Sequence, residues 1–200
     1  MEKFCRSTVV KDYAELLQRL KKETHKNYPL MYVLHRLVYS GEVAIFGGFV
    51  RDIALGRSYN DIDIVFKPYL EGRSALLDNL ICLLEQDKNR SVTSFGGYRF
   101  TYKHQRFDIF QLEETWAFKN KKVTPICFEN LPLTTYFSTD SICWHINKNK
   151  LFCLNNYLNL LQNGEFEIIL AENPDVEKMQ RRQKYFENKY YMKLKNKDKI

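Results

Sequence analysis

The stretch of sequence that decides the fold reads Gly47-Gly48-Phe49-Val50-Arg51-Asp52-Ile53-Ala54-Leu55-Gly56-Arg57 and, after a short gap, Asp61-Ile62-Asp63-Ile64. The apolar run 43–46 stops at the two glycines, which is typical of a buried strand that enters a tight turn. Residues 49–55 then have helical spacing, and Gly56 stands where a helix C-cap is expected. Residues 61–66 alternate strictly and are rich in β-branched side chains, and Pro68 follows them, so they predict a strand.

Two carboxylates share one face of this predicted strand. Residues two apart in a strand point the same way, so Asp61 and Asp63 project together about 7 Å apart, while Ile62 and Ile64 face the core. Carboxylates held side by side repel each other unless something such as a divalent cation neutralises them. A pair of this kind is also common on a solvated sheet face, so the pair alone leaves both interpretations open.

A third acid strengthens the metal interpretation. Asp108 lies in another predicted strand, residues 106–111, with apolar neighbours in sequence. If that strand lies beside the one carrying Asp61 and Asp63, the three acids converge. Such a site can hold two Mg²⁺ ions that clamp the attacking and leaving oxygens in phosphoryl or nucleotidyl transfer.

The residues before the acidic strand predict a phosphate-binding turn. Gly47 and Gly48 lie directly before a helix, a geometry that brings backbone N–H groups close to an anion such as a triphosphate. Arg51, one turn into that helix, can add a charge-assisted contact to phosphate. Asp52 can orient Arg51 or a neighbouring loop.

These motifs together resemble the head-domain signature of bacterial CCA-adding enzymes and poly(A) polymerases, in the DNA polymerase β-like nucleotidyltransferase superfamily. Every position of the pattern G-G-x-V-R-D-x-x-L-G-R followed by D-x-D is met. The resemblance implies an α+β fold, with a mixed or antiparallel nucleotidyltransferase sheet flanked by helices, and a Mg²⁺-dependent enzyme. It implies Asp61 and Asp63 as ligands of two Mg²⁺ ions and Asp108 as the third catalytic carboxylate. The nucleotide-binding candidates are Gly47, Gly48, Arg51, Asp52 and Arg57.

The chain departs from the family pattern in two places. The family motif R-R-D-F-T-x-N-A-L corresponds to residues 134–142, where the second half is kept but R-R-D has become Thr134-Thr135-Tyr136. Family members also continue into helical neck, body and tail domains, where an E-D-x-x-R motif reads the incoming base. Only Asp175, Lys178 and Arg181 hint at that motif, and a solvated helix face is the other interpretation.

Positive charge is concentrated at the C-terminus. The 200 residues carry a net charge of +7, and residues 176–200 hold nine basic and three acidic side chains, so the rest is nearly neutral. Candidate RNA contacts are Lys178, Arg181, Arg182 and Lys184, because phosphate contacts come largely from Lys and Arg. The interleaved aromatic residues can stack on unpaired bases or pack onto the body. These are Tyr185, Phe186, Tyr190 and Tyr191.

Three segments are predicted: N-terminal helices packed on the head (1–40), a catalytic head (41–155) and a helical, basic extension (156–200). We expect helices at 11–22, 29–39, 49–55, 74–84, 157–161 and 175–193, and a short helix or a loop at 116–122. Beyond 43–46 and 61–66, we expect strands at 91–95, 98–103, 106–111, 142–145 and 151–153.

The sequence as a whole narrows the class of function. Five scattered cysteines without a C-x-x-C pair argue against a disulfide framework or a structural zinc site and favour a reducing compartment. No apolar run approaches about 18 residues and no signal-peptide core is visible, so we expect a cytoplasmic protein without a membrane partner.

We expect a minimal nucleotidyltransferase that moves a nucleoside monophosphate from ATP or CTP to an acceptor hydroxyl, most simply an RNA (tRNA) 3′ end. The alternatives are a weak or inactive nucleotide-binding or regulatory module, or a toxin-like nucleotidyltransferase acting on tRNA, a protein or a small molecule. A homo-oligomer or a partner protein is compatible with either.

Overall fold

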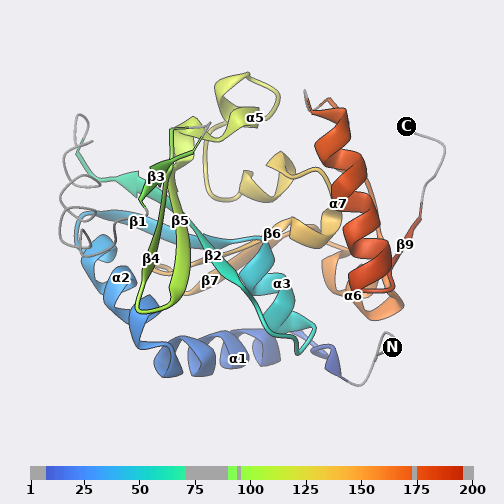
Figure 1. Cartoon of the computed structure of the whole chain (residues 1–200), viewed down its shortest axis with the longest axis horizontal. Helices are drawn as coiled ribbons and strands as arrows, with labels where there is room; N and C mark the ends of the chain where they lie inside the picture. Colours follow the sequence, from blue (N-terminus) through green and yellow to red (C-terminus); the bar gives the residue numbers. More distant parts are fainter. Residues whose placement is uncertain (1–7, 71–89, 94–95, 173–174, 196–200) are drawn as a thin grey trace.

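The computed structural model describes residues 8–70, 90–93, 96–172 and 175–195. Its centre is a seven-stranded, mostly antiparallel sheet flanked by helices, so the predicted α+β class is confirmed (Figure 1). The spatial order is β3-β4-β5-β2-β1-β6-β7. The strands are β1 (Gly41–Phe46), β2 (Asp61–Pro68), β3 (Ser91–Val92), β4 (Tyr98–Tyr102), β5 (Gln105–Gln111), β6 (Ile142–His145) and β7 (Lys150–Cys153).

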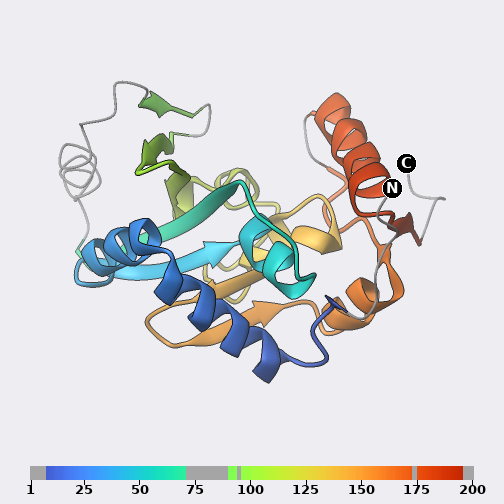
Figure 2. The same cartoon turned by 60° about the horizontal axis from the view of Figure 1, so that its bottom comes forward.

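The helices lie beside and at the ends of this sheet. They are α1 (Tyr13–Lys26), α2 (Tyr28–Val38), α3 (Gly48–Ala54), α5 (Trp116–Lys119), α6 (Tyr157–Asn163) and α7 (Val176–Lys189). In Figures 1 and 2, α2 and α7 stand at opposite ends of the molecule. The predicted helix at 74–84 lies outside the described residues. None of the described helices is long and apolar enough to cross a membrane.

Local signals in the sequence start the two N-terminal helices. Asp12 caps α1 by accepting a hydrogen bond from the Glu15 N–H, and Asn27 does the same for α2 through the Leu30 N–H. Pro29 stands in the first turn of α2, where its missing N–H costs nothing. The predicted boundaries of these helices therefore hold to within a few residues.

The predicted helix at 175–193 is wrong at its C-terminal end. The observed helix, α7, ends at Lys189. Tyr191 then has a positive φ of 54°, where the chain turns back. Lys193–Leu194 (β9) then pairs in parallel with Glu165–Phe166 (β8). These strands have two residues each, too few to give a periodic sequence signal.

The described parts of all three predicted segments share one hydrophobic cluster. Leu16 of α1, Ile45 of β1 and Phe186 of α7 are fully buried members of it. Burial of such side chains against one another is the main force that holds the helices on the sheet. The division at residues 40 and 155 stays a prediction.

The register of the central strands positions the acidic residues. β2 runs antiparallel to β1 and parallel to β5, so Phe46 lies opposite Asp63 and Asp63 lies opposite Asp108. Ile62 and Ile64, on the other face of β2, are fully buried as predicted. The expectation that the strand carrying Asp108 lies beside the strand carrying Asp61 and Asp63 is therefore confirmed.

Candidate active site

Asp61, Asp63 and Asp108 lie on the same face of the two adjacent parallel strands. Asp63 and Asp108 are paired in register, and Asp61 is two residues earlier on β2. On the far side of Asp108, Arg99 of β4 is its antiparallel partner. Because side chains at paired positions in neighbouring strands are close together, this row brings three carboxylates and a guanidinium to one place.

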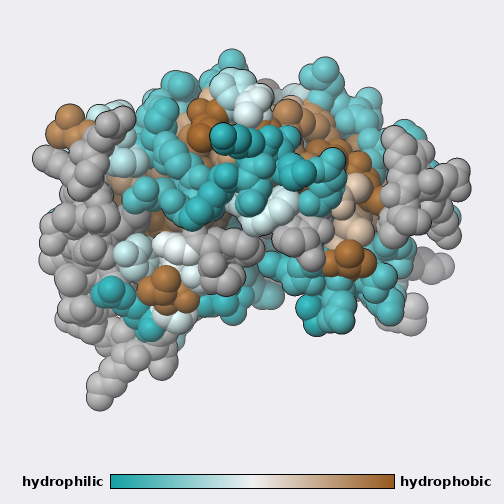
Figure 3. Space-filling model, turned by 90° about the horizontal axis from the view of Figure 1, so that it is seen from above, coloured by the Kyte–Doolittle hydropathy of each residue, from teal (hydrophilic) through white to brown (hydrophobic). Residues whose placement is uncertain are grey.

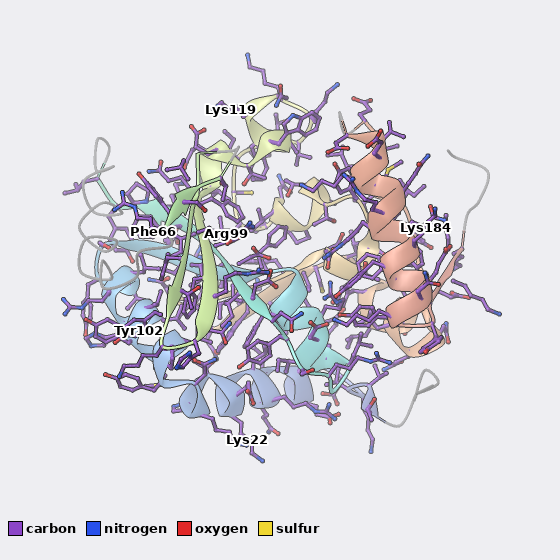
Figure 4. All side chains as sticks on the ribbon, in the orientation of Figure 1. Lys22, Phe66, Arg99, Tyr102, Lys119 and Lys184 are labelled. Carbon is purple, nitrogen blue, oxygen red and sulfur yellow. The ribbon has the colours of Figure 1, made fainter. Side chains whose placement is uncertain are left out.

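Two arginines hold two of the three carboxylates. Arg99 donates from Nε and Nη2 to the two oxygens of Asp108, at 2.8 and 2.5 Å. Arg106 donates from Nη2 to Asp61 Oδ2 at 2.6 Å. Figure 4 shows Arg99 near the middle of the molecule, within reach of β5. Both guanidinium groups are about half exposed, so these ion pairs are weakened by water and salt.

Asp63 is left with like charges around it. Burial raises the pKa of its carboxyl to about 7, and the negative charges of Asp61 and Asp108 act in the same direction. Arg182 acts against this rise. A carboxyl that is costly to ionise in this setting is one that a cation would stabilise.

The donor set fits magnesium in chemistry, although the side chains do not form a ready-made cage. Carboxylate oxygens are the ligands that Mg²⁺ prefers. Within the described ranges, however, no group of three or more His, Cys, Asp or Glu side chains is arranged so as to hold a metal ion. The ion pairs of Asp61 and Asp108 account for this, because those carboxylates are turned toward Arg106 and Arg99.

The acidic row opens into a cleft of about 940 Å³. Its floor includes Gly47, Gly48 and the three aspartates, and its opposite wall is α7. The replaced segment Thr134-Thr135-Tyr136 also lines it. Figure 3 views the molecule from the side of α5, where hydrophilic side chains cover much of the middle. A cleft of this volume is large enough for a small-molecule ligand.

The glycine turn lies at the edge of the cleft next to Asp63. Gly47 has φ 64° and ψ −113°, a conformation that strongly favours glycine, and its N–H donates to the Ile142 carbonyl at 2.9 Å. Gly48 begins α3. The predicted strand–turn–helix geometry is therefore present, and it brings this backbone beside the acidic row.

Arg51 has a different environment from the one expected of a phosphate ligand. It is 2% exposed, and its guanidinium donates to Asp52 Oδ1 at 3.0 Å, to the Tyr190 hydroxyl at 3.0 Å and to Asp140. Burial alone would lower the pKa of Arg51, but Asp140 and Asp52 hold it well above its usual range. The hydrogen-bonding capacity of this side chain is used within the protein.

Asp52 and Arg57 have the same kind of role. Tyr190 donates from its hydroxyl to Asp52 at 2.8 Å, and Arg57 donates to the Lys189 carbonyl at 2.8 Å. The Arg57 guanidinium also stands over the Tyr190 ring at 5.1 Å. Arg51, Asp52 and Arg57 are not among the described residues that line the cleft. They attach the C-terminal end of α7 to α3.

One face of α7 is turned toward the acidic row. Lys178, Arg181, Arg182 and Tyr185 line the cleft, at the spacing of residues that share a helix face. Arg182 donates to Asp140 at 2.8 and 3.1 Å. Lys184 does not line the cleft and projects from α7 on the side away from β4 and β5 (Figure 4).

The aromatic residues of this helix are divided between packing and the cleft. Phe186 and Tyr190 are fully buried, so their rings are not available to unpaired bases and the packing interpretation is correct for them. Tyr185 is half-buried and lines the cleft. The alternation follows helical periodicity, with the buried rings against the core.

Sequence reasoning missed several residues at this site. Arg99 and Arg106 gave a weak signal, since each lies in a predicted strand, but their pairing with Asp108 and Asp61 depends on strand register. Asp140, whose pKa is held low by Arg182 and Arg51 despite burial, appeared only as a surviving position of the downstream motif. Tyr190 was expected to stack or to pack, but its hydrogen bonds with Asp52 and Arg51 gave no signal, because these partners are 138 and 139 residues away.

Comparison with solved structures identifies the fold. A CCA-adding enzyme complexed with CTP superposes with a TM-score of 0.62 at 20% identity, covering 93% of this chain and 44% of that one. The Thermotoga maritima CCA-adding enzyme complexed with tRNA gives 0.59 at 20% identity, covering 94% and 43%. A tRNA nucleotidyltransferase complexed with a primer tRNA and an incoming ATP analogue gives 0.56 at 19% identity, covering 78% and 44%.

The chain spans less than half the length of these enzymes. No family model matches the sequence, and no curated protein matches it significantly. At these identities the likeness concerns the fold. The chain therefore has the nucleotidyltransferase-like fold that CCA-adding enzymes have over a little more than two fifths of their length.

Proposed function

We propose that this protein is a nucleotidyltransferase that moves a nucleoside monophosphate from ATP or CTP to an acceptor hydroxyl, most simply an RNA 3′ end such as that of tRNA. The observation that carries the proposal is the register of β2 and β5. It aligns Asp63 with Asp108, with Asp61 on the same face and the Gly47–Gly48 turn beside them. The likeness to enzymes solved with CTP, with an ATP analogue and with tRNA supports the choice of substrates.

In this proposal Asp61, Asp63 and Asp108 hold two Mg²⁺ ions. The ions supply the charge that stabilises the attacking and leaving oxygens of an in-line displacement. Arg99 and Arg106 must release Asp108 and Asp61 for those carboxylates to bind the ions. Both guanidinium groups are about half exposed, so they can turn into the cleft, where a triphosphate is an alternative partner.

The other wall of the cleft compensates for the altered downstream motif. The family's two arginines are replaced by Thr134 and Thr135, which remove positive charge from the cleft lining. Lys178 and Arg181 of α7 bring positive charge to the same cleft. In the proposal, these side chains contact the nucleotide or the acceptor phosphates, while Arg51, Asp52 and Arg57 keep α7 in place.

The test is transfer of label from α-labelled ATP or CTP, with Mg²⁺, to total RNA, with a protein lysate in parallel. Asp63→Asn removes the central carboxylate and is expected to abolish labelling, whereas Lys184→Ala, on the outer side of α7, is expected to retain it. Labelling that persists in Asp63→Asn would contradict the assignment of the acidic row.

A nucleotide-binding module without turnover is the second candidate. It is favoured by the ion pairs that occupy Asp61 and Asp108. This candidate predicts nucleotide binding in calorimetry with no label on RNA, on protein or on small molecules. Label on a protein, with none on RNA, would instead support a toxin-like nucleotidyltransferase.

A further inference from the structure

A second surface with nucleic-acid-binding chemistry lies at the tip of the β4–β5 hairpin. Three tyrosine rings form a continuous ladder there: Tyr28 and Tyr32 of α2 are 6.3 Å apart, and Tyr32 stacks on Tyr102 of β4 at 5.3 Å. Tyr28 is 57% exposed. An exposed ring of this size at the edge of a ladder offers a face on which a base can stack.

Positive charge surrounds this ladder. Lys103 places its Nζ 4.4 Å from the centre of the Tyr28 ring, and the Arg36 guanidinium stands 5.4 Å over Tyr32. Lys26 and His104 line a hollow of about 390 Å³ beside the same hairpin tip. Glu23 also lines the hollow and accepts a hydrogen bond from Tyr59 at 3.0 Å. Basic side chains between stacked aromatic rings are the combination that single-stranded nucleic acid binds.

The backbone of the turn is strained at the two basic residues. Tyr102 pairs with Gln105, so Lys103 and His104 alone form the turn, and their φ angles are 46° and 69°. A two-residue turn with positive φ at both positions is normally Asn-Gly or a similar pair. Lysine and histidine are unfavourable there, so their presence points to a use for the side chains rather than for the turn itself.

The hairpin connects this surface to the acidic row. Gln105 and Asp108 are three residues apart on β5, which corresponds to about 10 Å along the strand. Arg106, between them, carries its charge on the same face as Asp108. Tyr102 and its partner Gln105 point to the opposite face of the sheet from Asp108, so a polynucleotide whose end lies at Asp108 reaches the aromatic ladder by passing over the turn at Lys103 and His104.

We infer that this surface, defined by Lys26, Tyr28, Tyr32, Arg36, Tyr102, Lys103 and His104, binds a single-stranded RNA segment. In the context of the proposed function, on which the choice of RNA rests, that segment is the acceptor strand upstream of its 3′ end. The aromatic ladder stacks bases and the basic side chains contact phosphates. This surface is separate from α7.

The test measures binding without catalysis, by fluorescence anisotropy of a labelled, unstructured 12-nucleotide RNA in EDTA with no NTP. Tyr28→Ala is expected to weaken binding about tenfold, while Tyr28→Phe retains it, since stacking needs the ring and not the hydroxyl. Tyr39→Ala removes a 75% exposed tyrosine at the other end of α2 and is the matched control, expected to leave binding unchanged.

A double substitution in the β4–β5 turn is expected to raise the stability of the protein and to lower its affinity for RNA. Lys103→Asn/His104→Gly installs the preferred turn residues and is expected to raise the melting temperature while weakening RNA binding. The slope of log K against log salt should become shallower by about 0.7 for each phosphate that the variant no longer neutralises. Lys121→Asn is the matched control, because Lys121 is also an exposed lysine with positive φ, at 55°.

Unchanged RNA affinity in both Tyr28→Ala and the turn variant would overturn the inference, as would a wild-type protein that binds no RNA. If the wild type and both variants label a 12-nucleotide RNA acceptor equally well, the inference is overturned. The proposed function stands in that case. RNA binding that depends on Tyr28 and Lys103, without transfer to any acceptor, would uphold the surface and contradict the proposed function.

Discussion

Arg51 donates a hydrogen bond from Nη2 to the hydroxyl of Tyr190 at 3.0 Å, and that hydroxyl in turn donates to Asp52 at 2.8 Å. These two hydrogen bonds join α3, at the floor of the cleft, to the residue that directly follows α7. Since α7 forms the opposite wall of the cleft, the separation of the two walls depends on this buried group of side chains. Arg51 and Asp52 of the signature motif thus help to set the separation of the cleft walls without lining the cleft themselves.

Tyr190→Phe is expected to loosen α7. The substitution keeps the buried ring but removes the hydroxyl, leaving Arg51 and Asp52 each one partner short, at a cost of about 1–3 kcal/mol. Amide hydrogen exchange in α7 should accelerate more than exchange in β1 and β2. Tyr39→Phe, on an exposed ring, is the control. Unaltered exchange in α7 would show that the hydroxyl does not hold the helix.

Arg51→Met is expected to be strongly destabilising. It leaves the carboxylates of Asp52 and Asp140 without their buried guanidinium partner, and breaking a buried pair in this way typically costs about 3–5 kcal/mol. The free energy of unfolding in urea measures the effect. The double variant Arg51→Met/Asp52→Asn should recover part of the loss, since it removes the buried carboxylate that loses its guanidinium partner, whereas Asp140 keeps its ion pair with Arg182. Additive losses in the double variant would contradict the pairing.

The contribution of Asp63 to the stability of the metal-free protein should fall as the pH rises from about 4 to about 7. The pKa of Asp63 is raised to about 7 in the folded protein, so in this window the folded state keeps a proton that the unfolded chain has lost. Asp63→Asn removes the charge and should be the more stable protein at pH 8, by on the order of 2 kcal/mol after allowance for partial exposure. The free energies of unfolding of Asp63→Asn and the wild type, measured at pH 5 and pH 8 in EDTA, test this. The same difference between the two proteins at both pH values would contradict it.

Arg99→Gln is expected to strengthen binding of divalent cations. The guanidinium competes with a cation for both oxygens of Asp108, and a half-exposed ion pair of this kind is worth about 0.2–1 kcal/mol, or up to about fivefold in affinity. Titration with Mn²⁺, followed by electron paramagnetic resonance, measures it without any turnover. Arg90→Gln, at an arginine next to the Tyr98 ring, is the control. Weaker Mn²⁺ binding in Arg99→Gln would show that the arginine assists the metal site.

Gly47→Ala and Gly48→Ala should differ in stability. Gly47 has φ 64° and ψ −113°, a sparsely populated conformation that costs a residue with a Cβ about 1–3 kcal/mol, although the nearest atoms to that Cβ lie 3.6 Å away or farther. Gly48 has no positive φ, and a Cβ there would be in ordinary van der Waals contact with the Arg51 guanidinium at 3.6 Å, so alanine is expected to be tolerated. Thermal unfolding of the two variants compares them. A larger loss of stability at Gly48 would contradict the conformational argument.

Much of the fold could be predicted from local sequence. The apolar run before Gly47, the alternation from Asp61 and the caps at Asp12 and Asn27 depend on near neighbours, and the elements they predict are present. The shared face of Asp61 and Asp63 follows from the two-residue repeat of a strand. The short strands β8 and β9 could not be predicted, because pairs of two residues have no periodicity.

The sequence by itself determined the strand–turn–helix, the acidic pair and the concentration of charge after residue 175. Only the tertiary structure decided which partner each charge has. It joins Arg99 to Asp108, Arg106 to Asp61 and Arg51 to Tyr190 across sequence separations of 9, 45 and 139 residues. Side chains so far apart interact through strand register and helix docking, which are fixed by burial of the whole core and leave no local pattern in the chain.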